Sequence, residues 1–464
     1  MRNIFKIHYI KYLLLLILSY NLLSCESLID IDLPDDQINT EDVFKDINTA
    51  KGALANLYIN VRQSSLFNGS YTGLGTIASL HTDDLNPYGQ ATNSITIANV
   101  DIYNGNIVST NSAITNLWTS SYFHIYAINA FINGLSKSNS ISENEKKVML
   151  AEARFLRVLY YQYLTQLFND IPYTSSTDYN YNKSINKLSQ NQLYLSLENE
   201  LDQIIQDLPI EYRHKDRIFP NKSTAELLLA QNYLLQKKYD KAIIQATNVV
   251  NNSVYTLETS LDKVFKKDAK STIWQLSPSD VNIATLEATN YYFSNKPVTH
   301  YLSPSLVSSF EESDLRKQNW IRKIEDNNTI WYHNYKYKNV NNNTDEYSIV
   351  FRLEEVYFVL VEAYINQNQT DKASNFLNKI RKRAGLKELP NNLSQEQLKD
   401  ELLKECRKEF FCENGHRFLD LKRNNKLTLI EQTKPTWNDK HQLFPIPESE
   451  ILLNTNLLPQ NDGY

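Results

Sequence analysis

Long helical segments with recognisable starts set the architecture that this 464-residue chain can adopt. Apolar side chains in residues 148–163 recur at the spacing of one helix face. Residues 142–145, Ser-Glu-Asn-Glu, form a capping box, in which two side chains satisfy each other's free backbone donors. The same signature stands at residues 223–226 and 394–397. We therefore expect a mostly α-helical protein.

Two helical pairs share a spacing that is typical of tetratricopeptide repeats. The pattern Tyr233-x8-Ala242 recurs as Tyr364-x8-Ala373, and each alanine follows an Asp-Lys pair. A small residue where two helices cross lets their backbones approach. Stacked pairs bury a continuous core only when they touch, so we expect the two units to meet in space. The helical pairs are expected at about 41–61 with 112–135, 143–168 with 191–208, 224–250, and 350–384.

Irregular insertions interrupt the predicted helices. The insertion at 62–111 is rich in Gly, Ser, Thr and Asn. The insertion at 252–348 lacks helical periodicity, although Trp274 lies in an apolar stretch that suggests a strand. Long irregular stretches within a compact domain more often serve function than spacing. We expect one domain over residues 25–464 with a tetratricopeptide-like scaffold and a loop-rich, minor-β ligand region. Its scaffold segments are expected at about 40–61, 112–251 and 350–425, its insertions at 62–111 and 252–348, and its tail at 426–464.

Residues 1–24 have the organisation of a lipoprotein signal peptide: a basic start, an apolar run and a small residue before a cysteine. The apolar run at 13–18 is much shorter than the roughly 20 residues that span a bilayer. Ser24 before Cys25 fits the lipobox of bacterial lipoproteins. We expect cleavage before Cys25 and acylation of that residue, which anchors the protein stably. An ordinary signal peptide with a coincidental cysteine is the alternative.

Several blocks, taken together and in order, resemble the SusD/RagB family of outer-membrane nutrient-binding lipoproteins. The resemblance covers most of the chain after Cys25. The blocks are Ala-Glu-Ala-Arg-Phe-Leu-Arg at 151–157, Ser-Pro-Ser-Leu-Val through Asp-Leu-Arg-Lys at 303–317, Phe-Arg-Leu through Glu-Ala at 351–363 with Arg-Lys-Arg-Ala-Gly at 381–385, His-Arg-Phe-Leu-Asp-Leu-Lys-Arg at 416–423, and the terminus at 443–464.

The resemblance implies a binding role without catalysis or a cofactor. The protein would be held at the outer membrane through Cys25 and exposed at the cell surface. It would capture an oligosaccharide and pass it, as a lid, to a SusC-like TonB-dependent outer-membrane transporter. Two alternatives stay open: the same role with peptide cargo, and a surface glycoside hydrolase.

Aromatic residues in the two insertions are the candidate ligand platforms. Sugar rings present apolar C–H faces that stack on Trp and Tyr, while polar side chains beside the rings bind hydroxyl groups. Tyr103 and Trp118 lie near predicted helix starts and fit either a core or a ligand role. The predicted ligand-binding residues are Tyr71, Asp83, Tyr88, Tyr291, Tyr292, Trp320, Trp331 and Tyr332. Asp83 has a turn-forming role as its alternative.

Three carboxylates at Glu405, Glu409 and Glu413 stand four residues apart on one helical face. Paired carboxylates suit glycoside hydrolysis, but the same face offers ion pairs to neighbouring Lys and Arg side chains. We favour the structural role and expect links to Lys408, Arg417 and Arg423.

The remaining features exclude several classes of function. The net charge of −5 and the lack of a dominant basic run argue against nucleic-acid binding. Cys406 and Cys412 have too few potential ligands nearby for zinc, so we interpret both as buried small apolar residues and expect no metal.

Overall fold

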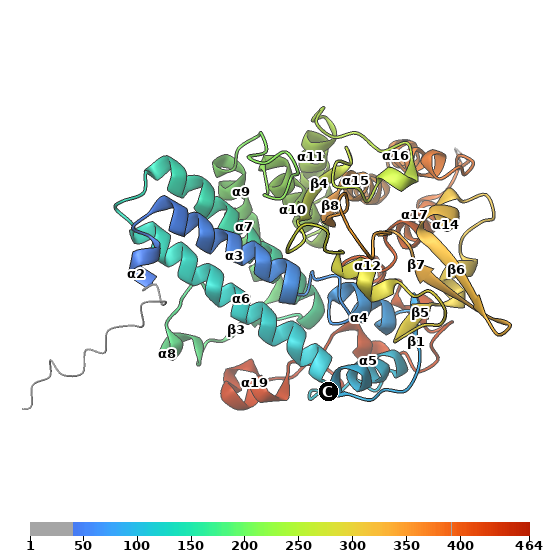
Figure 1. The fold of residues 1–464 in the computed structure, drawn as a ribbon, viewed down its shortest axis with the longest axis horizontal. Helices are drawn as coiled ribbons and strands as arrows, with labels where there is room; N and C mark the ends of the chain where they lie inside the picture. Colours follow the sequence, from blue (N-terminus) through green and yellow to red (C-terminus); the bar gives the residue numbers. More distant parts are fainter. Residues whose placement is uncertain (1–39, 391) are drawn as a thin grey trace, which may run out of the picture.

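The computed structural model describes residues 40–390 and 392–464. The predicted signal peptide and Cys25 lie outside the described residues. The protein is mostly helical, as predicted (Figure 1). Within the described part of the chain, no helix combines the length and apolar character that crossing a membrane requires.

The first long helices, α3 (Ile47–Ser64) and α6 (Ser112–Lys137), pack against each other and extend to the left in Figure 1. A single helix from residue 40 was predicted, but the short α2 (Thr40–Val43) precedes α3 instead. Asp46 separates the two, because its side chain accepts hydrogen bonds from two backbone N–H groups of the first turn of α3. Such a cap fixes a helix start.

The other long helices form a chain of packed neighbours that reaches the right side of the molecule (Figure 1). Helix α7 packs on α6 and α9, α9 on α10, α10 on α11, α11 on α15, and α15 on α16 and α17. The contact between α11 and α15 joins the two repeat units across the long insertion, as the repeat predicts. The helices are α7 (Glu143–Phe168), α9 (Gln190–Asp207), α10 (Lys222–Leu235), α11 (Tyr239–Val250), α15 (Leu353–Asn366), α16 (Thr370–Arg383), α17 (Gln395–Phe410) and α18 (His416–Arg423).

The repeat residues lie where the helices cross. Ala242 and Ala373 are fully buried, and Tyr233 is 4% exposed. Tyr364 stacks on Phe376 of the following helix, with ring centroids 6.0 Å apart. Small and aromatic residues therefore alternate at these crossings, as the sequence pattern predicts.

The three predicted capping boxes have different outcomes. Ser394 caps α17 through a complete box. The hydroxyl of Ser142 caps α7 by accepting from the backbone of Glu145, but it donates to the Glu145 carboxylate, which therefore does not complete the box at the backbone. The prediction at residues 223–226 is wrong. Helix α10 begins two residues earlier than predicted, because Asn221 and Thr224 form the box.

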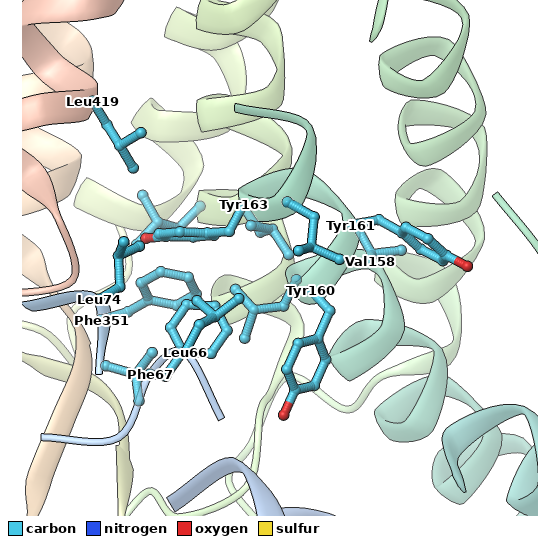
Figure 2. Close-up of a cluster of buried hydrophobic side chains, with 14 of the residues drawn as sticks. Leu66, Phe67, Leu74, Val158, Tyr160, Tyr161, Tyr163, Phe351 and Leu419 are labelled. Carbon is cyan, nitrogen blue, oxygen red and sulfur yellow. The ribbon is translucent and has the colours of Figure 1, made fainter. Parts of the chain in front are cut away.

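A continuous apolar core runs beneath the scaffold. Phe67, in the segment after α3, lies edge-on to Tyr160 and Tyr163 of α7, with centroids 5.9 and 4.7 Å apart. Figure 2 shows Leu66, Phe67 and Leu74 gathered against these tyrosines. The segment that joins α3 to α4 thus packs onto helix α7.

The insertion at 62–111 is more helical than predicted. It contains α4 (Leu74–His81) and α5 (Ser94–Asn104) besides strand β1 (Leu85–Pro87). A tight turn leads into α4, since a Cβ on Gly73 would lie 1.8 Å from the carbonyl oxygen of Asn68. Seven of the eight residues of α4 are buried, so it shows no amphipathic period in sequence.

The strands form four antiparallel two-stranded sheets: β1 with β5, β2 with β3, β4 with β8, and β6 with β7. The strand predicted around Trp274 is β4, and the β6–β7 hairpin projects at the right edge of Figure 1. The other strands are β2 (Ile171–Pro172), β3 (Lys187–Leu188), β4 (Thr272–Leu276), β5 (His300–Leu302), β6 (Ile321–Asp326), β7 (Thr329–Asn334) and β8 (Ser348–Arg352). The short helices are α8 (Tyr179–Asn182), α12 (Leu286–Tyr291), α13 (Pro304–Ser308), α14 (Leu315–Trp320), α19 (Glu448–Leu453) and the 3-10 turns η2 (Leu261–Lys263), η3 (Leu427–Ile430), η4 (Asp439–Gln442) and η5 (Thr455–Leu457).

Candidate functional site

Strands from both insertions meet on one side of the molecule. Strand β1 pairs with β5 in a register that places Asn86 opposite Tyr301, and β5 also contacts β7. Just beyond β1, the backbone N–H of Tyr88 donates to the carbonyl oxygen of Thr299 at 2.7 Å. Residues more than 200 positions apart in the sequence are thereby fixed side by side.

Three aromatic rings cluster where these strands meet. The ring of Tyr88 stands edge-on to that of Trp331, with centroids 5.7 Å apart, and to that of Tyr301 at 6.4 Å. All three side chains are partly buried, so each is held in place yet keeps some accessible surface. Asn86 and Tyr103 supply polar groups beside them, joined by a 3.2 Å hydrogen bond from the Tyr103 hydroxyl to Asn86 Oδ1. We call these five residues the aromatic face.

Three more predicted residues pack against histidines of β5 and β7. Tyr71 stacks on His300, the neighbour of Tyr301, at 5.7 Å and 15° between ring planes. Tyr291 packs edge-on to the same imidazole, but it is only 4% exposed and its hydroxyl lies 3.0 Å from Thr76 Oγ1. Tyr292 is 39% exposed and packs against His333 of β7. Tyr71 and Tyr292 therefore have accessible surface. Tyr291 is instead buried and packs against His300 inside the protein.

Two predicted aromatic platforms have other roles. Trp320 is fully buried: it lies edge-on to Phe265, and its indole N–H donates to the carbonyl oxygen of Leu261 at 3.1 Å. No face of this ring is open to a ligand, so its assignment as a platform does not fit the structure. Tyr332 follows Trp331 on a strand, where successive side chains point to opposite faces, and it packs against the apolar cluster around Trp320.

Asp83 also does not fit a ligand role. It is 4% exposed, and its carboxylate lies 2.9 Å from Arg407 Nη2 and 3.0 Å from Arg417 Nε. Burial alone would raise its pKa, but Arg417 and Arg407 hold the pKa of Asp83 below its usual value. Asp83 and its neighbour Asp84, which pairs with Arg407 at 2.8 Å, tie the end of α4 to α17 and α18.

The carboxylates spaced four apart lie at the centre of a buried charge network. Glu405 and Glu409 are fully buried, and both pair with Arg316, at 2.7 and 3.2 Å. Glu409 also receives Arg352 at 2.6 Å and Arg383 at 2.5 Å. Burial disfavours the charged carboxylate, yet Arg383, Arg352 and Arg316 keep the pKa of Glu409 well below its usual value.

The structural interpretation of these carboxylates fits, but only some of their partners were predicted. Glu405 pairs with Lys408 at 3.0 Å, as expected. Arg417 and Arg423 instead bind Asp83 and Glu362. Cationic neighbours hold the pKa of Glu405 and of Glu409 below its usual value, so neither is poised as a proton donor. Both are fully buried, so a substrate does not reach them as nucleophiles.

The cysteines of α17 and its C-terminal turn are buried and unpaired, as predicted. Cys406 lies on the helix, whereas Cys412 lies beyond its end with a φ of 61°. Over residues 40–390 and 392–464, no group of three or more His, Cys, Asp or Glu side chains is placed to hold a metal ion.

Comparison with known proteins identifies the fold and the family. The sequence model of the SusD family matches residues 169–464, more than half of the chain. The chain belongs to the SusD family. A second model, described as "Starch-binding associating with outer membrane", matches residues 32–234. As a SusD-family member, the protein is a binding protein rather than an enzyme.

Individual relatives extend this similarity over most of the chain. "SusD-like protein P2" of Formosa agariphila is 26% identical over 416 residues, which cover 76% of this chain and 81% of the relative. A SusD superfamily structure from Bacteroides vulgatus has a TM-score of 0.77 at 19% identity, covering 91% of this chain and all of that one. Surface glycan-binding protein A from Bacteroides thetaiotaomicron, solved in complex with laminarihexaose, has a TM-score of 0.75 at 18% identity, covering 89% and 99%.

Sequence reasoning missed Asn86 and Tyr301 of the aromatic face. Their signal was weak, because each lies in a three-residue strand whose partner is more than 200 residues away. The polar-aromatic pair becomes visible only through the register of β1 with β5.

Proposed function

We propose that this SusD-family protein binds an oligosaccharide at the aromatic face. The observation that carries the proposal is the cluster of Tyr88, Tyr301 and Trp331, three partly accessible rings held at fixed angles by β5, β7 and the segment after β1. Rigid aromatic surfaces with a few placed polar groups are typical of ligand sites. Asn86 and Tyr103 are such groups, and their amide and hydroxyl suit sugar hydroxyls.

Laminarihexaose and starch fragments are the first glycans to test. The solved complex of surface glycan-binding protein A contains laminarihexaose, and the second matching family model is described as starch-binding. We infer that the cargo is a glycan rather than a peptide, because depletion of aromatic residues at the site would favour a peptide and the aromatic face is rich in them. The hydrolase alternative loses its candidate acid, because cationic neighbours hold the pKa of Glu405, Glu409 and Glu413 below its usual value. Glu405 and Glu409 are also fully buried, away from any substrate.

The proposal includes the setting in which binding serves uptake. Acylated Cys25 anchors the protein to the outer membrane with the aromatic face exposed to the medium, and a SusC-like TonB-dependent transporter receives the cargo. The lipobox sequence and family membership support this part. No covalent step on the glycan is required.

Isothermal titration calorimetry with laminarihexaose and maltohexaose tests the binding site. Trp331→Ala and Tyr88→Ala should each weaken binding at least about fivefold, since loss of one stacking platform costs on the order of 1 kcal/mol or more. Tyr179→Ala is the matched control: this tyrosine is 75% exposed on α8 and belongs to no part of the aromatic face. The assignment would be overturned if Trp331→Ala and Tyr88→Ala bound the glycans as tightly as the wild type. It would also be overturned if Tyr179→Ala weakened binding as much as they do.

A further inference from the structure

A second polar cavity lies among helix ends of the scaffold, and none of its lining residues belongs to the aromatic face. It has a volume of about 270 Å³, near the lower limit of ordinary small-ligand sites. Its lining includes Tyr194, Lys237, Tyr239, Asn366, Lys399 and Lys422. We call this cavity the lysine cleft. Its size suits a single sugar-sized molecule rather than an oligosaccharide.

The lysines of the cleft have little anionic compensation within the described chain. Lys422 Nζ donates to the backbone carbonyl oxygen of Gln166 at 2.6 Å, and no carboxylate of the described residues lies within 4.0 Å of it. The side chain of Lys237 makes no hydrogen bond or ion pair with any described residue. Lys399 lies 3.9 Å from Glu396, at the limit of an ion pair. Three lysine residues therefore line one small cavity.

The acidic residue of the cleft is already neutralised. Both oxygens of Glu362 bind Arg423, at 2.7 and 2.8 Å. The same guanidinium also binds Asp420 at 2.7 Å. Arg423 thus serves both Glu362 and Asp420, and Asp420 also lies 3.3 Å from His416 Nδ1. Among the described residues, neither carboxylate forms an ion pair with a lysine of the cleft.

Helix dipoles reduce this positive charge but do not remove it. The last turns of α7, α10, α15 and α18 contribute residues to the lining, and so do the first residues of α9 and α11. At about half an elementary charge per helix end, four C-termini and two N-termini sum to roughly one negative charge. Lys422 is only partly protonated near pH 7, because burial lowers its pKa to about 7, so the three lysines supply somewhat less than three positive charges. Their charge still exceeds what the helix ends compensate.

Neutral polar groups complete the cleft. Tyr194 is 3% exposed and Tyr239 is partly buried, and neither hydroxyl makes a hydrogen bond with another described residue. Asn366 lies at the end of α15 beside them.

Burial lowers the pKa of Lys422 to about 7, because the protonated form loses its contact with water. A bound anion would stabilise the protonated form of Lys422 again.

We propose that the lysine cleft binds a compact oxyanion, a carboxylate or a sulfate, carried on a small hydroxyl-rich molecule such as an acidic monosaccharide. The ammonium groups bind the anion, and the two tyrosine hydroxyls bind the hydroxyl groups of the ligand. Charge-assisted hydrogen bonds of this kind are the stronger ones in proteins. The site is separate from the aromatic face and does not depend on its function.

Titration of the mature chain with sodium glucuronate, sodium sulfate and glucose tests the proposal. Both anions should bind saturably, whereas glucose should not. Tighter binding of glucuronate identifies the carboxylate of a sugar acid as the preferred group, and tighter binding of sulfate identifies a sulfate ester; either supports the site. Lys422→Met should weaken anion binding about tenfold, and Lys237→Met, an exposed position that folding tolerates, should weaken it severalfold.

Lys215→Met is the matched control, because Lys215 is exposed and does not line the cleft. Trp331→Ala should leave anion binding unchanged, which separates this site from the aromatic face. Absence of saturable binding of both anions, or affinities that Lys237→Met leaves unchanged, would overturn the proposal even if Lys422→Met does not fold.

Discussion

Replacing Glu409 by glutamine tests whether the carboxylates of α17 hold α14, β8 and α16 together. Glu409 is fully buried and contacts Arg316, Arg352 and Arg383, which come from α14, from β8 and from α16. Glutamine keeps the shape of the side chain but removes the negative charge, so three guanidinium groups lose a shared partner inside the protein. Removing one member of a buried ion pair typically costs about 3–5 kcal/mol, because the remaining charge is left uncompensated.

The expected cost is large for one conservative substitution. For a chain of this length, it corresponds to a fall of about 4 °C in melting temperature. Guanidinium denaturation followed by circular dichroism should show a lower midpoint with an unchanged slope, which reports stability without a change in exposed surface.

Glu312→Gln is the matched control for this experiment. Glu312 also pairs with a cation, Lys317 at 2.7 Å, but its side chain is 95% exposed. Exposed pairs contribute little to stability, so this variant should unfold like the wild type. If Glu409→Gln also unfolds like the wild type, the buried network does not stabilise the fold as argued.

Three further predictions concern titration, the reassigned aspartate and the anchor. Burial raises the pKa of Glu355 to about 7, so the folded protein holds this proton between about pH 4.5 and 7 while the unfolded chain releases it. The free energy of unfolding should therefore fall as the pH rises from about 4.5 to 7, and Glu355→Gln should make this fall smaller. The same pH dependence in the variant and the wild type would contradict this role of Glu355. Asp83→Asn should lower the melting temperature because Arg417 loses its ion pair and Arg407 keeps only Asp84, yet leave glycan affinity unchanged in calorimetry. Cys25→Ser should abolish labelling with palmitate and release the protein from membranes on fractionation, whereas labelling that persists in this variant would exclude the proposed anchor.

Helices with strong local signals were predictable from the sequence. The start of α7 follows from Ser142 and Glu145, which are three residues apart and need no distant partner. Helix α4 was missed because seven of its eight residues are buried, which removes the amphipathic period that identifies a helix. Its position depends on packing against α18, far away in sequence.

The candidate site was only partly predictable because burial depends on distant contacts. Trp320 and Trp331 look alike in sequence, since both lie in an insertion among polar residues. Their roles separate in space: Trp320 donates to Leu261 within a core, whereas Trp331 points to the other side of its hairpin toward Tyr88. For Asp83, the deciding partners, Arg407 and Arg417, lie more than 300 residues away in α17 and α18.

Tryptophan fluorescence gives the most direct test of the aromatic face. The chain has five tryptophans, and the four other than Trp331 are between 0% and 8% exposed. Quenching by iodide therefore reports mainly on Trp331, and Trp331→Phe should remove most of it. Saturation with the glycan that binds in calorimetry is predicted to protect this fluorescence from iodide. Full iodide access to Trp331 in the glycan-saturated protein would contradict the proposal that the aromatic face holds the cargo.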